Sequence, residues 1–147
     1  MKRLTILLLA LMVPAAALAQ DPGPMLVNEK VMGSASELPY PVAQMTPSDI
    51  DQYNIGLRNG ITRAFQSHGK TLATDDISIQ SQIMPYGSRS IVRSTVITRV
   101  SGTYQLVFMG IVGSNLVGVF CTAARPFEAS GNDCERQLKQ TFGEGGQ

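Results

Sequence analysis

Four runs of alternating, strand-forming residues follow one another between residues 77 and 123. Turn-forming residues such as Gly87 and Gly102 separate the runs. Strands joined by short turns pair antiparallel with their sequence neighbours. The pattern therefore predicts a four-stranded antiparallel meander. Its strands are residues 77–84, 89–100, 103–112 and 116–123.

Alternation along these strands places apolar side chains on both faces of the sheet. Pairing Val100 with Thr103 and Val112 with Val117 sets the expected register. The first face then carries Ile77, Ile79, Ile83, Val92, Val96, Val107, Met109, Ile111, Leu116 and Phe120. The second face carries Ile91, Ile97, Leu106, Phe108, Val112, Val117, Val119 and Cys121. A sheet that is apolar on both faces needs a cover on each side.

The clearest helix pattern covers residues 46–68 and supplies the first cover. Thr46 can cap this helix, Pro47 suits its first turn, and Asp49 stands where a capping box places an acid. Apolar or small residues then recur three and four positions apart, and Gly69 follows as a stop. We expect this helix to pack on one face of the sheet.

Two glycines, Gly56 and Gly60, lie one turn apart inside this helix. Each lowers helix propensity by about 1 kcal/mol relative to alanine. Something should compensate for that loss. We interpret the pair as a flat surface that lets the helix approach the sheet closely.

The N-terminus has the three parts of a secretory signal peptide in the expected sequence order. Residues 2–3 are positively charged, residues 4–13 form an uncharged apolar run, and residues 17–19 have the small-x-small pattern of a cleavage site. The run of roughly ten residues is shorter than the ~20 that a spanning helix needs. We predict cleavage between Ala19 and Gln20, which places the mature protein in the periplasm or outside the cell without a membrane span.

Removing 19 of the 147 residues leaves 128, enough for one domain with its own core. Residues 20–45 are predicted to be an extended segment that can include a short strand. Residues 46–143 are predicted to be a single α/β domain, and residues 144–147 a flexible tail. Cleavage also removes two of the 12 basic residues and leaves 10 against 11 acidic ones, a net charge of −1. This near-neutral charge excludes a strong electrostatic surface for nucleic acid.

The second cover is predicted at the C-terminus, where Asn132 or Asp133 can cap a helix that ends at Phe142. Two cysteines in an oxidising compartment predict a disulfide, Cys121 to Cys134. On the chain-entropy account, a loop of this length stabilises the fold by about 3 kcal/mol. The bond would hold the helix against the second face of the sheet.

The residues therefore predict an α+β fold, with a four-stranded antiparallel meander sheet packed between an N-terminal long helix and a C-terminal helix. This order of elements, over residues 46–142, resembles the PsbP-like α/β sandwich family. The stretches that carry the resemblance are residues 104–108 (YQLVF), residues 116–120 (LVGVF) and the closing helix with Leu138 and Phe142. The resemblance implies a non-catalytic accessory or envelope protein and carries no specific functional residue.

One edge of the second face is the candidate ligand surface. The residues that share it are Gln80, Gln82, Arg89, Arg93, Arg99 and Tyr104. We expect Tyr104 to oppose Arg99, and Arg93 to oppose Gly110, which would leave room above the strand. Guanidinium groups beside an apolar floor suit a carboxylate or phosphate ligand. Alternatively, the arginines only solubilise an edge strand with their charged ends.

No spacing of residues predicts a catalytic residue, a metal site or a cofactor. The sequence therefore predicts a non-catalytic binding or interaction module of the bacterial envelope, whose partner is a small anionic ligand or an envelope protein. One alternative is an inhibitor or accessory partner of another envelope protein. Another is a hydrolase-type enzyme that would use His68, Asp75 or Asp76.

Overall fold

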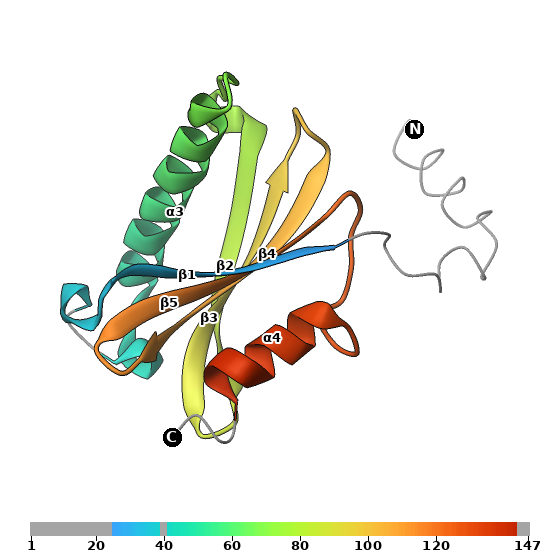
Figure 1. Cartoon of the computed structure of the whole chain (residues 1–147). Helices are drawn as coiled ribbons and strands as arrows, with labels where there is room; N and C mark the ends of the chain where they lie inside the picture. The colour runs from blue at the N-terminus through green and yellow to red at the C-terminus, as the bar shows by residue number, and fades with distance from the viewer. Residues whose placement is uncertain (1–24, 39–40, 144–147) are drawn as a thin grey trace, which may run out of the picture.

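A computed structural model describes residues 25–38 and 41–143, which form an α+β fold with one antiparallel sheet and a helix on each face (Figure 1). In spatial order the strands are β1 (Leu26–Ser34), β5 (Asn115–Ala123), β4 (Thr103–Val112), β3 (Arg89–Thr98) and β2 (Ile77–Tyr86). The helices are α3 (Pro47–Ser67) and α4 (Asp133–Phe142), with 3-10 turns η1 (Ala35–Glu37), η2 (Val42–Gln44) and η3 (Thr74–Asp76).

The predicted signal peptide (residues 1–19), its cleavage position between Ala19 and Gln20, and the predicted tail at 144–147 lie outside the described residues. No helix within the described ranges has the length and hydropathy to cross a bilayer. The α+β class and the order of a long helix, a meander and a closing helix are confirmed.

The prediction of four strands is wrong, because β1 pairs antiparallel with β5 and adds a fifth strand at that edge. The register of β1 shifts between Val31 and Gly33, which marks a β-bulge. Most of its side chains are exposed, including Leu26 and Val31 at 73% and 66%. Backbone pairing rather than burial of one face holds this strand. Its sequence therefore lacks the alternation of apolar and polar residues that indicates a strand.

The expected register is wrong by two residues at two turns. Thr103 pairs with Thr98, and Val112 pairs with Asn115. The turn between β3 and β4 is therefore longer than expected, whereas the turn between β4 and β5 has only two residues, with Gly113 at a φ of 62°. Because successive side chains alternate between faces, a shift of two leaves each side chain on its predicted face.

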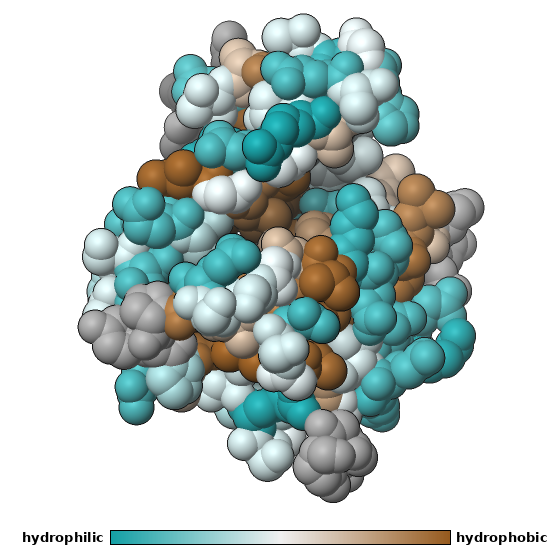
Figure 2. All heavy atoms as spheres, turned by 60° about the vertical axis from the view of Figure 1, so that its left-hand side comes forward, coloured by the Kyte–Doolittle hydropathy of each residue, from teal (hydrophilic) through white to brown (hydrophobic). Residues whose placement is uncertain are grey.

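Helix α3 covers the first face of the sheet. It begins as predicted: the Thr46 side chain accepts the Asp49 N–H (3.2 Å), and Asp49 Oδ2 accepts the Thr46 N–H (2.8 Å). The buried residues of this side are Val42, Met45, Leu57, Leu72, Ile77, Val92, Val96, Val107, Met109 and Leu116. Figure 2, which turns the α3 side forward, shows a largely hydrophilic surface with hydrophobic atoms in a central hollow.

Gly56 and Gly60 do not face the sheet, so the interpretation of a close helix–sheet approach is wrong. Both glycines are exposed, and a Cβ built on either would meet nothing within 4 Å. The residues that α3 turns toward the sheet include Tyr53 and Leu57, which pack into the core clusters. The two glycines therefore lower helix propensity without any packing gain among the residues that the structure describes.

Helix α4 covers the second face, and the predicted disulfide Cys121–Cys134 is present. Asn132 caps the helix, since its Oδ1 accepts the N–H groups of Cys134 (2.9 Å) and Glu135 (3.3 Å). The buried residues on this side are Ile91, Leu106, Phe108, Val117, Val119, Cys121, Cys134, Leu138 and Phe142. All the strand residues among them belong to the predicted second face.

The last turn of α4 meets the sheet at Gly110. A Cβ on Gly110 would lie 2.8 Å from Phe142 Cε1 and 2.9 Å from Ile91 Cγ2. Phe142 is 1% exposed. The missing side chain of Gly110 therefore makes the space that the Phe142 ring fills.

We expect Gly110→Ala to lower the free energy of unfolding by about 1–3 kcal/mol, because the added methyl group overpacks a closed site. Gly56→Ala is the matched control, and we expect it to raise the free energy of unfolding by roughly 0.5–1 kcal/mol through helix propensity. Urea unfolding of the oxidised protein measures both. Equal stability of the Gly110→Ala variant and the parent would contradict the packing described.

Candidate functional site

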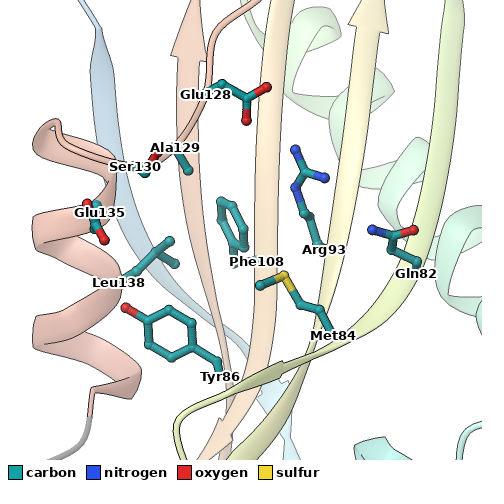
Figure 3. A pocket seen from close by; sticks show the side chains of 10 residues that line it. All are labelled: Gln82, Met84, Tyr86, Arg93, Phe108, Glu128, Ala129, Ser130, Glu135 and Leu138. Carbon is teal, nitrogen blue, oxygen red and sulfur yellow. The ribbon is translucent and has the colours of Figure 1, made fainter.

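One cleft lies on the second face of the sheet, beside α4, and has a volume of about 370 Å³ (Figure 3). We call it the sheet–helix cleft. Its lining residues come from β2, β3, β4, α4 and the segment that precedes α4. They are Gln82, Met84, Tyr86, Arg93, Phe108, Glu128, Ala129, Ser130, Glu135 and Leu138.

The floor of the sheet–helix cleft is apolar. Phe108 and Leu138 are buried members of the core, and Met84 and Tyr86 pack against the same core cluster while remaining partly exposed. Helix α4 packs against β1, β4 and β5. Among the described residues, no helix covers the second face of β2 and β3 beyond α4.

Charged side chains stand at one end of the sheet–helix cleft. In Figure 3 Arg93 and Glu128 reach toward the same end, away from Tyr86. Among the described residues, Arg93 and the Glu128 carboxylate have no ion-pair partner. The Glu135 carboxylate is already engaged, because it accepts the Gly131 N–H and lies 3.8 Å from Lys139 Nζ. The cleft thus presents one cation and one uncommitted carboxylate.

The structure brings together only two of the six residues predicted for the ligand surface. Gln82 and Arg93 are cross-strand partners in the sheet–helix cleft. Gln80 lies on the same face, but it does not line the cleft. Arg89 is partly buried, and its Nη1 donates to the Ile111 carbonyl (2.9 Å), a contact that ties two strands together.

The register shift displaces the remaining predicted contacts. Arg93 opposes Phe108 rather than Gly110, and Tyr104 opposes Ile97 rather than Arg99. Arg99 lies in the turn after β3, at a different cleft. The six residues therefore do not form one surface.

Sequence reasoning missed the wall of the sheet–helix cleft that faces the sheet. Glu128 and Ser130 lie between β5 and α4, in a segment without strand or helix periodicity. Tyr86 was assigned to a turn, but it is the last residue of β2 and lines the cleft. Only the predicted position of α4 on the second face could have indicated this wall.

A second cleft, of about 450 Å³, lies where α3, the start of β2 and the β3–β4 turn meet. We call it the helix–turn cleft. Its lining residues are Arg58, Thr74, Asp75, Ile77, Ser78, Ile79 and Arg99. It shares no residue with the sheet–helix cleft.

A small polar cluster lies between α3 and the first face of the sheet. Ser81 Oγ donates to Asn54 Oδ1 (2.5 Å) and lies 2.6 Å from Ser94 Oγ. The neighbouring Tyr53 hydroxyl is buried, and no described residue meets it at hydrogen-bond geometry. Burial raises the pKa of Tyr53 to about 12, and the nearby Ser94 hydroxyl opposes part of that rise.

We expect the protein to lose stability as pH rises from about 10 to 12. Because the pKa of Tyr53 is higher in the folded state than the 10.0 of a free tyrosine, the unfolded chain releases the proton first. The stabilisation is complete below pH 10, and its loss above that pH amounts to about 2–3 kcal/mol. Chemical unfolding at several pH values measures the slope. The Tyr53→Phe variant is the control and should lose less stability than the parent over this range.

The residues considered for catalysis are not gathered in one site. His68 is exposed at the end of α3, where its Nδ1 lies 3.1 Å from both the Ala64 carbonyl and Ser67 Oγ, and it lines neither cleft. The Asp76 carboxylate accepts the Ala73 N–H (2.8 Å), and Asp75 lines the helix–turn cleft. Within the part of the chain that the structure describes, no three His, Cys, Asp or Glu side chains could jointly hold a metal ion.

No known protein family, no curated protein and no solved structure matches this chain.

Proposed function

We propose that the protein is a non-catalytic binding module that holds a small ligand in the sheet–helix cleft. One observation carries the proposal. Arg93 and Glu128, whose charged groups are unpaired within the described residues, stand at the same end of a cleft whose floor is apolar. Ligand sites in proteins combine an apolar lining with a few placed polar groups in this way.

The cleft chemistry favours a ligand that carries an acid, an amine and an apolar body. Arg93 can bind a carboxylate through two parallel N–H donors. Glu128 attracts a cation, so a purely anionic ligand would be repelled by it and by Glu135. Met84 and Tyr86, which are partly exposed above the buried Phe108, offer contact for an aliphatic or aromatic group. An apolar amino acid or a short peptide meets all three requirements, which revises the expectation of a simple anion.

The proposed setting is the bacterial periplasm or the extracellular space. The disulfide Cys121–Cys134 supports this setting, because such bonds persist in oxidising compartments. The signal pattern in residues 1–19 agrees with it. A binding module of the envelope would meet amino acids and peptides there.

The test compares leucine with leucinamide, which lacks the acid, and with 4-methylpentanoate, which lacks the amine. We expect leucine or leucylleucine to raise the thermal midpoint of the oxidised protein most. A ligand at about 100 times its Kd stabilises by roughly 2.7 kcal/mol, which amounts to several degrees. Arg93→Gln should remove the preference for leucine over leucinamide, because the acid then has no partner. Glu128→Gln should remove the preference for leucine over 4-methylpentanoate, because the amine then has no partner.

Arg63→Gln is the control variant, because Arg63 is exposed on α3 and lines neither cleft. We expect it to bind like the parent protein. If no ligand of the series shifts the midpoint, the small-ligand proposal is wrong. That outcome would favour the alternative, an inhibitor or accessory partner of another envelope protein.

A further inference from the structure

The helix–turn cleft gathers two arginines from distant parts of the chain. Arg58 comes from the middle of α3, and Arg99 comes from the turn between β3 and β4. The Arg99 N–H donates to the Asp76 carbonyl (2.9 Å), which fixes this turn beside the start of β2. The fold thus holds the two arginines at one cleft. The ligand proposed for the sheet–helix cleft would not contact either of them.

One nitrogen of the Arg58 guanidinium group lacks a hydrogen-bond acceptor among the described residues. Its Nε is buried, and no described residue accepts a hydrogen bond from it. Buried donors in folded proteins are almost always paired, and an unpaired charged donor costs stability. Nε itself is enclosed, so an acceptor that enters the cleft would bind the terminal nitrogens of Arg58. These nitrogens belong to the same planar, charged guanidinium group and are not among the buried unpaired atoms.

The charges that line the helix–turn cleft favour an anion. Arg58 and Arg99 face a single lining carboxylate, that of Asp75. Within the described residues, neither arginine forms an ion pair with it. The lining therefore carries a net charge of +1, whereas the sheet–helix cleft carries Arg93 against two glutamates. An oxyanion would select the helix–turn cleft over the other one.

We propose that the helix–turn cleft is a second binding site, which takes a phosphate-type oxyanion between Arg58 and Arg99. A tetrahedral oxyanion has enough acceptors for both guanidinium groups and for the hydroxyl group of Thr74, which also lines the cleft. Ile77 and Ile79 form an apolar wall that strengthens the attraction by lowering the local dielectric constant. This site is independent of the proposed amino-acid site.

Calorimetric titration of the oxidised protein with inorganic phosphate at constant ionic strength tests the proposal. We expect saturable binding in the parent protein. Arg58→Gln and Arg99→Gln should each weaken it by about tenfold or more, as loss of a charge-assisted contact does. Asp75→Asn should strengthen it, because a repulsive charge is removed. Arg93→Gln and Arg63→Gln are controls that should bind phosphate like the parent.

Several outcomes would overturn the proposal. These are an absence of saturable binding to the parent, unchanged affinity in Arg99→Gln, and equal weakening in Arg63→Gln. Arg99 is exposed, so its variant stays informative if Arg58→Gln does not fold. Parallel titrations with glycerol 3-phosphate and with phosphatidylglycerol vesicles identify the source of the phosphate group. Leucine binding with no phosphate binding would remove this inference alone.

Discussion

The need to cover a sheet that is apolar on both faces determines most of this structure. Five strands spaced by about 4.8 Å make a sheet roughly 19 Å wide, whereas one helix with its side chains is only about 10–12 Å wide. A single helix on each face therefore cannot cover every strand. Helix α3 lies over β2 on one face, and α4 lies over β4, β5 and β1 on the other. The strip left open beside α4 is the sheet–helix cleft.

Local patterns in the sequence predicted the parts of the fold that local forces decide. The capping residues Thr46 and Asp49 and the cysteine pair act over short distances or through a covalent bond, and they lie as expected. Side-chain alternation predicted the faces because parity survives a register error of two. Strand β1 was missed as a member of the sheet, since it pairs with β5, a strand far away in the sequence, and since most of its side chains are exposed.

The candidate sites were less predictable than the fold, because their walls come from segments with no periodicity. Side-chain parity placed Gln82 and Arg93 on one face, and the pairing of β2 with β3 makes them direct neighbours. Glu128 was not placed beside them, because nothing in the segment after β5 indicates which way it folds over the sheet. Arg99 was assigned to a strand expected to end at Val100, but β3 ends two residues earlier, at Thr98. Arg99 therefore lies in the turn, at the same cleft as Arg58 of α3. A helix residue and a turn residue meet only through the packing of the whole domain.

Helix α4 is anchored at both ends. Its first turn is bonded covalently to β5 through Cys134, and its last turn inserts the Phe142 ring into the space above Gly110. The two anchors prevent the helix from sliding along its axis or rolling on the sheet. Glu135 and Leu138, which lie between the anchors, therefore form a wall that is set before any ligand arrives. A preorganised wall has little conformational freedom to lose on binding. The affinity of the cleft therefore depends on how well the shape of a ligand matches it, so ligands of similar size but different shape bind with different affinities.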